Sequence, residues 1–267
     1  MSSVSTSMPA VTFPRPNPLQ ICFKEAKYEF LKCLRTPMYS VSTMLFPIMF
    51  YVLFGLVMGR QMIGGISTTV YLIPAYGTFG VMGASLVGTA ATLASDRGLG
   101  WLEVKKASPM PMYAYFLGKL VMSVMFSTVD VLMLLTLGFA FGGVHLPALV
   151  AAKLVLTLVA GSLPFCAMGL AIGYFAGPTS APAVINIFYL PMSFCSGLWM
   201  PFMFLPKFIQ KIAVFLPPYH LSQLAFRQVG AGQGGPALWH WESLIGFALI
   251  CLGVAWVGHQ RDQRANG

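Results

Sequence analysis

Residues 154–206, LVLTLVAGSLPFCAMGLAIGYFAGPTSAPAVINIFYLPMSFCSGLWMPFMFLP, contain no formally charged side chain. This stretch is 53 residues long, whereas about 20 helical residues cross the hydrocarbon core of a bilayer. The sequence GPTSAP at residues 177–182 is a strong turn signal that divides the stretch. We therefore expect two membrane-spanning helices here, at about residues 154–175 and 183–203.

Further stretches of low charge extend this pattern along the chain. They predict spans at about residues 38–59, 70–94, 111–141 and 243–258, the last near the lower length limit for a spanning helix. Of the whole chain 57% is apolar and 9% is charged, against about 25% charged residues in soluble domains. The predicted fold class is an all-α membrane protein, with six transmembrane helices within residues 37–260.

The N-terminal region before the first span has two parts. Residues 1–18 are rich in Ser, Thr and Pro and predict a disordered cytoplasmic tail. Residues 19–36 predict an amphipathic interfacial helix, whose cations would meet anionic lipid; a helix packed against a soluble partner is the alternative. The apolar stripe of this helix consists of Leu19, Cys22, Phe23, Ala26, Phe30, Cys33 and Leu34, and Lys24, Glu25, Lys32 and Arg35 lie away from it.

The region between spans five and six is irregular. Pro191, Gly197 and Pro201 interrupt span five, and SGLWMP at residues 196–201 predicts a break near the outer face. Two apolar segments follow, at residues 206–215 and 219–227, separated by LPP at residues 216–218. Both are too short to span, so we expect short re-entrant or interfacial helices.

The basic residues give the orientation. Eleven of the sixteen lie on the side of the two termini, which favours cytoplasmic termini, with residues 261–267 as a short cytoplasmic tail. The net charge of +9 therefore indicates membrane orientation and no nucleic-acid partner, because these residues flank apolar spans. The eleven are Arg15, Lys24, Lys27, Lys32, Arg35, Arg97, Lys105, Lys106, Lys119, Arg261 and Arg264; the other five are Arg60, Lys153, Lys207, Lys211 and Arg227.

The loop DRGLGWLEVKKASP, residues 96–109, holds the densest cluster of charge in the chain. Residues 101–107 predict about two helical turns, with Glu103 and Lys106 spaced as an ion pair. A short helix between two spans would suit a lever moved by a soluble motor. The alternative is an ordinary charged loop that only fixes topology.

Three features together resemble the permease subunits of ATP-binding-cassette exporters of the second type, which export drugs, lipids or polysaccharides. They are the amphipathic helix before span one, the acidic-Arg-x-x-Gly pattern in DRGLG at 96–100, and SGLWMP followed by Leu205-Pro206 and LPPYH at 216–220. The resemblance covers nearly all of residues 19–260. It implies a bacterial inner-membrane protein, a pair of six-span subunits around a central path, and a coupling region containing Asp96, Arg97, Gly100 and Glu103.

ATP would be handled by a partner. The chain has no Gly-x-x-x-x-Gly-Lys-Ser/Thr loop, so ATP and Mg²⁺ are expected on a separate ABC ATPase subunit, and no cofactor on this chain. The four histidines fall outside the spans or at their ends, no His-Glu-x-x-His occurs, and the five cysteines lack metal-ligand spacing. We therefore expect no catalytic or metal site, and a transport subunit that is not itself an enzyme.

Asp130 lies well inside the third span, where a carboxylate is costly and usually faces a polar cavity or partner. It is a candidate for the transport path or for gating. Alternatively it is protonated, or hydrogen-bonded to Ser127 or Asn186, and serves only helix packing. The rival function is a self-sufficient secondary transporter or channel using Asp130; a helix break in one span only favours the ATP-driven exporter of an apolar or amphipathic substrate.

Overall fold

The computed structural model describes residues 17–57, 62–63, 65–108, 110–232 and 234–265. The tail predicted at residues 1–18 therefore lies mostly outside the described residues. Strands β1 (Met62–Ile63) and β2 (Ile66–Ser67) form a small antiparallel hairpin. The helical elements are α1 (Pro18–Leu34), α2 (Pro37–Phe50), the π-helical η1 (Tyr51–Val57), α3 (Thr68–Gly98), α4 (Trp101–Ala107), α5 (Met112–Phe141), α6 (Ala148–Ala160), α7 (Ser162–Phe175), α8 (Ala181–Cys195), the 3₁₀ turn η2 (Phe202–Phe204), α9 (Lys207–Ala213), α10 (Pro217–Gln228) and α11 (Ala237–Ala265).

Within the described residues, four helical stretches are long and apolar enough to cross a membrane: Thr68–Gly98, Met112–Phe141, Ala148–Phe175 and Ala237–Arg264. Two shorter apolar helices, Thr43–Val57 and Ala181–Cys195, lie where the first and fifth spans were expected. The all-α membrane class is thus supported, and four of the six expected spans correspond to long apolar helices. The first span is modified by Pro47 and a π-helical end, and the fifth ends early at a break.

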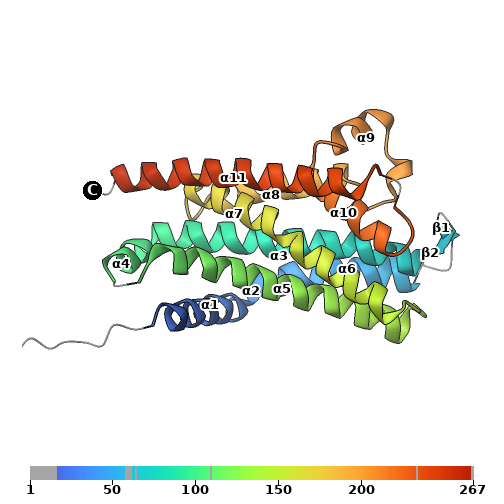
Figure 1. The fold of residues 1–267 in the computed structure, drawn as a ribbon, viewed down its shortest axis with the longest axis horizontal. Helices are drawn as coiled ribbons and strands as arrows, with labels where there is room; N and C mark the ends of the chain where they lie inside the picture. Colours follow the sequence, from blue (N-terminus) through green and yellow to red (C-terminus); the bar gives the residue numbers. More distant parts are fainter. Residues whose placement is uncertain (1–16, 58–61, 64, 109, 233, 266–267) are drawn as a thin grey trace, which may run out of the picture.

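The long helices lie side by side with α3 at the centre of the bundle (Figure 1). Small residues let neighbours approach α3 closely: a Cβ atom on Gly77 would lie 2.8 Å from the side chain of Leu158. The C-terminus, α1 and α4 lie at one end of the bundle, here termed the α4 end. Helices α9 and α10 and the hairpin lie at the other, the α10 end.

Helix α11 is longer than the span predicted at residues 243–258. Its polar ends are held by tertiary contacts that hydropathy cannot detect. Near its start, His240 Nδ1 lies 2.9 Å from Nδ1 of His220 on α10. Near its end, Asp262 pairs with Arg97 of α3. The residues predicted as a C-terminal tail are therefore helical as far as Ala265.

The chain around α8 differs in detail from the expected pattern. Helix α8 continues through Pro191, and the chain leaves it only at residues 196–201, where Gly197 adopts a φ of 75°. The span predicted at residues 154–175 is divided at Gly161, where the side chain of Leu221 packs so closely that a Cβ atom would clash. The break at residues 196–201 lies where SGLWMP predicted it, whereas the division at Gly161 lies within an apolar stretch and was not predicted.

Helix α1 packs through only part of its apolar stripe, together with acidic side chains. Ala26 and Cys33 of the stripe are buried, but Leu19 and Phe23 are about three-quarters exposed. The acid Glu29 is buried instead, because α5 supplies a lysine partner. The exposed apolar residues are what a membrane-interface helix would present to lipid.

Candidate functional site

Adjacent residues on the last turn of α3 face in different directions. Asp96 is buried, and its carboxylate accepts hydrogen bonds from Tyr115 Oη at 2.9 Å, from Lys119 Nζ at 3.1 Å and from Lys32. Arg97 donates to Asp262 Oδ1 through Nε at 3.0 Å and through Nη2 at 2.7 Å. Asp96 therefore joins α3 to α1 and α5, whereas Arg97 joins α3 to α11.

Lys119 of α5 is the centre of the buried part of this network. Its side chain is fully buried, and Nζ donates to Glu29 Oε2 at 2.6 Å, Thr92 Oγ1 at 2.8 Å and Asp96 Oδ2 at 3.1 Å. One ammonium thus has three oxygen partners on two other helices, which is the condition for burying a cation. The surrounding helices α1, α3 and α5 are held together at this point.

Helix α4 joins the same network through Lys105. Its ammonium pairs with Glu25 and, at 3.2 Å, with Glu29 Oε1, and it lies 4.5 Å from the centre of the Tyr115 ring. Burial alone would raise the pKa of Glu29, but the charges of Lys119, Lys32 and Lys105 outweigh it and lower the pKa. Burial alone would lower the pKa of Lys105, but the Glu25 hydrogen bond and the charge of Glu29 raise it.

The opposite side of α4 is exposed and partly apolar. The chain turns into α4 at Gly100, whose φ of 74° is left-handed, and Leu102 anchors the helix in the core. Trp101 and Val104 are 55% and 59% exposed, and Glu103 is exposed beside them. Between α1, α3 and α4 lies a cleft of about 430 Å³. A rigidly held helix with an exposed apolar face beside a charged cleft is suited to docking a partner.

The four residues predicted for coupling are therefore brought to the same end of the bundle, in different settings. Asp96 is buried in the network, Arg97 contacts α11, Gly100 makes the turn, and Glu103 lies on the exposed side of α4. The side chain of Lys106, predicted to pair with Glu103, lies outside the described part of the chain. Sequence reasoning missed Glu25, Glu29, Lys105, Lys119 and Asp262, although acids in an interfacial helix were a usable signal.

Asp130 is buried between α5 and α3. A Cβ atom on Gly80 would lie 1.7 Å from its Oδ2, and in the described part of the chain neither carboxylate oxygen has a hydrogen-bond partner. Ser127, suggested as a partner from the sequence, instead shares a hydrogen bond of 3.2 Å with Ser85. Among the described residues, close packing against Gly80 of the central helix therefore characterises the surroundings of this acid.

A groove of about 600 Å³ lies between α2, α3 and α8. Asn186, the other suggested partner of Asp130, lines this groove, whereas Asp130 does not. Tyr189 also lines this groove: its hydroxyl donates to Phe79 O at 3.3 Å and packs against Gly83. The groove combines aromatic side chains with Thr43 and Asn186, a lining that suits an amphipathic molecule.

The described residues contain no group of three or more His, Cys, Asp or Glu side chains that could hold a metal ion. A family model described as ABC-2 type transporter matches residues 22–227 of the chain. A Bacillus subtilis (strain 168) protein named "Putative transport permease YvfS" is 24% identical over 221 residues, which are 83% of this chain and 89% of the relative. The family-model match includes α4 and the residues of the charge network on α1, α3 and α5.

Proposed function

The chain belongs to the ABC-2 type transporter family, and we propose that it is the permease of an exporter driven by ATP hydrolysis on a separate ABC ATPase subunit. The observation that carries this proposal is α4: one side is fixed to three other helices, and the other side presents Trp101 and Val104. A partner that moved α4 would move α1, α3 and α5 with it. The family supports an ABC ATPase as that partner.

The motion would reach the membrane by two routes. Leu102 and the Gly100 turn connect α4 directly to α3, while Lys105 connects it to α1 through Glu25 and Glu29. Ion pairs buried from water transmit force well because separating them leaves uncompensated charges. We assign coupling to Asp96, Arg97, Gly100 and Glu103, and add Lys105 and Lys119 as positioning residues.

The proposed transport path is the groove between α2, α3 and α8. Its aromatic and polar lining supports an apolar or amphipathic substrate, and a second copy of the chain would enclose it from the open side. Asp130 would act on this path through Gly80 of α3, not by touching substrate. A self-sufficient transporter is less well supported, because Asp130 does not line the groove and the family is ATP-driven.

The proposed orientation places the α4 end in the cytoplasm of a bacterial inner membrane, together with both termini. The basic residues support it, since Lys24, Lys27, Arg97, Arg261 and Arg264 belong to elements at this end. In this orientation α4 faces the compartment that holds ATP. Helices α9 and α10 would lie at the outer surface.

Reconstitution tests the proposal. Proteoliposomes with the chain and the ABC ATPase encoded beside it should show ATP-dependent substrate movement, and the chain alone should hydrolyse no ATP. Trp101→Ala with Val104→Ala should reduce co-purification of the ATPase and leave thermal stability unchanged. Phe208→Ala with Leu238→Ala, equally exposed at the α10 end, is the matched control. Unchanged ATPase binding in the α4 variant, or intrinsic ATP turnover by the chain, would refute the proposal.

A further inference from the structure

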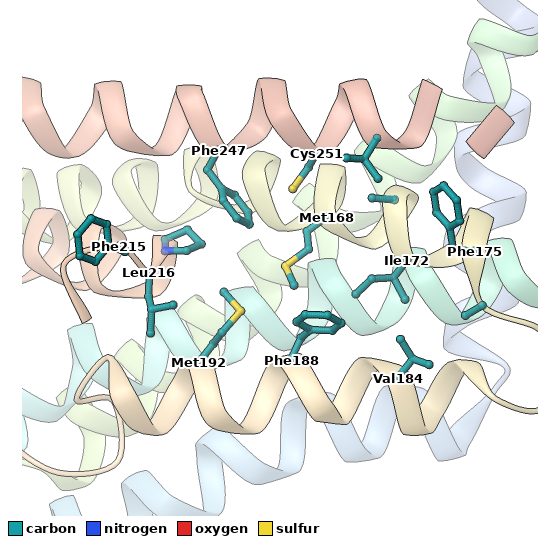
Figure 2. A pocket seen from close by; sticks show the side chains of 14 residues that line it. Met168, Ile172, Phe175, Val184, Phe188, Met192, Phe215, Leu216, Phe247 and Cys251 are labelled. Carbon is teal, nitrogen blue, oxygen red and sulfur yellow. The ribbon is translucent and has the colours of Figure 1, made fainter. Parts of the chain in front are cut away.

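A second groove lies between α8 and α11, with α7 as its floor (Figure 2). Its volume is about 580 Å³, and every side chain lining it is apolar apart from the thiol of Cys251. Figure 2 shows side chains of α8 and α11 pointing toward each other across it. Representative lining residues are Ile172, Phe188, Met192, Phe247 and Val254. An apolar groove of this size among membrane-spanning helices is accessible to hydrocarbon chains.

The groove ends in a cationic mouth at the α4 end. Phe247, Cys251 and Val254 line the groove from one face of α11, and the same i, i+3/i+4 spacing continues to Gly258 and Arg261. A cavity of about 280 Å³ adjoins the groove and shares Phe175 with it. The Arg261 guanidinium lies 5.9 Å from the centre of the Phe175 ring. The apolar lining therefore leads directly to an exposed arginine.

The charge at the mouth is positive. The adjoining cavity is lined by Arg97 and Arg261 against a single acid, Asp262. Arg97 is paired with Asp262 and also donates to Gly173 O at 3.0 Å, so its charge is largely compensated. Arg261 supplies the net positive charge, which suits a phosphate group.

The dimensions match one leaflet of a bilayer. Cys251 and Arg261 are ten residues apart on α11, a rise of about 15 Å. That is about half of the roughly 30 Å hydrocarbon core. A lipid with its phosphate at Arg261 would therefore extend an acyl chain along the groove to about the middle of the membrane.

We propose that this groove binds an anionic phospholipid of the cytoplasmic leaflet, with its phosphate at Arg261 and an acyl chain between α8 and α11. The leaflet rests on the orientation proposed above, and anionic lipids are concentrated on that side. The face of α8 that carries Val184, Phe188 and Met192 lines this groove, and the opposite face lines the proposed transport path. The bound lipid would thus fix the position of a helix that borders the substrate.

Native mass spectrometry of the delipidated chain, titrated with dioleoylphosphatidylglycerol or dioleoylphosphatidylcholine, tests the proposal. Phosphatidylglycerol should bind more tightly than phosphatidylcholine. Arg261→Gln should weaken phosphatidylglycerol binding about fivefold, and Arg261→Lys should restore most of it. Arg264→Gln removes an equally exposed charge one turn further on, outside the mouth, and should have no effect. Val254→Trp, which fills the groove, should weaken binding of both lipids.

Several outcomes would overturn the proposal. Equal losses in the Arg261 and Arg264 variants would mean that lipid is attracted only by general positive charge. Unchanged lipid binding with loss of the dimer in Val254→Trp would make the groove a subunit interface. Competition by a transported substrate for the phosphatidylglycerol site would make it part of the transport path. Because the titration uses the chain without ATPase or ATP, its failure is distinguishable from failure of the proposed transport function.

Discussion

The carboxylate of Asp130 occupies the space that a side chain at position 80 would need, because a Cβ atom on Gly80 would lie 1.7 Å from its Oδ2. Gly80→Ala should therefore force α3 and α5 apart and lower the free energy of unfolding by about 1–3 kcal/mol. Adding Asp130→Ala should recover most of this loss. Chemical unfolding of the single and double variants in mixed micelles measures the coupling, and additive losses would show that the two positions do not interact.

Lys119 is the centre of the buried network, so replacing it should strongly destabilise the fold. Lys119→Met leaves Glu29 and Asp96 buried without their shared cation, and we expect a loss of about 3–5 kcal/mol in the free energy of unfolding. Lys153→Met removes an exposed lysine from α6 and serves as the control. Thermal and chemical unfolding in detergent give the comparison. Similar stabilities of the two variants would mean that the network contributes little.

Acidification should release α4 from α1. The pKa of Glu29 lies below its ordinary value of 4.5, so its stabilising contribution is present above that value and is lost as the pH falls through the lowered pKa. The pKa of Lys105 is raised, so its contribution is lost only at strongly alkaline pH. Amide hydrogen exchange of α4, corrected for its intrinsic pH dependence, should therefore increase as the pH is lowered from 7 to below 4.

The Glu29→Gln variant is the control for this acid effect. It should show raised exchange in α4 already at pH 7 and a smaller further change on acidification. An identical pH profile in the variant and the wild-type chain would assign the acid response to other groups.

The orientation predicts opposite labelling of the two ends of the bundle. In a variant without native cysteines, Val104→Cys on α4 should react with a membrane-impermeant maleimide only from the cytoplasm. Lys211→Cys, exposed on α9, should react only from outside. Labelling in intact cells detects cysteines that are accessible from outside, and labelling in inverted vesicles detects those accessible from the cytoplasm. The reverse pattern would place α4 outside the cell and the proposed lipid site in the outer leaflet.

The sequence predicts the helices better than their contacts. Residues 101–107 are helical as expected, because Leu, Glu, Lys and Ala of the segment WLEVKKA have high helix propensity. The partners of Asp96 were not predictable, since Lys32 lies 64 positions away and Lys119 appears in the sequence only as a basic residue near the start of a span. Asp96 and Arg97 looked like one functional unit, but the helix directs their side chains to different neighbours.

The surroundings of Asp130 and of Arg261 likewise could not be predicted from the sequence. The sequence singled out Asp130 because an acid in an apolar span is rare, yet only the structure shows Gly80 as its neighbour. Arg261 was assigned to a terminal tail, because hydropathy falls near residue 258. The helix continues past that point, so Arg261 stays in line with Cys251 and Val254. The helix extends beyond its predicted end because tertiary contacts hold its polar end. Such contacts leave no periodic signal in the sequence.

The bond between Glu29 and Lys119 also has a consequence for how the chain is made. These residues are 90 positions apart, so at about 5–20 residues per second roughly 5–18 s separate their synthesis on the ribosome. During that interval Glu29 lacks Lys119 as a partner, and Lys105 is made only 76 positions after Glu29. Helix α1 therefore reaches its final position only after the start of α5 has been synthesised, although α1 itself is made before α2 and α3.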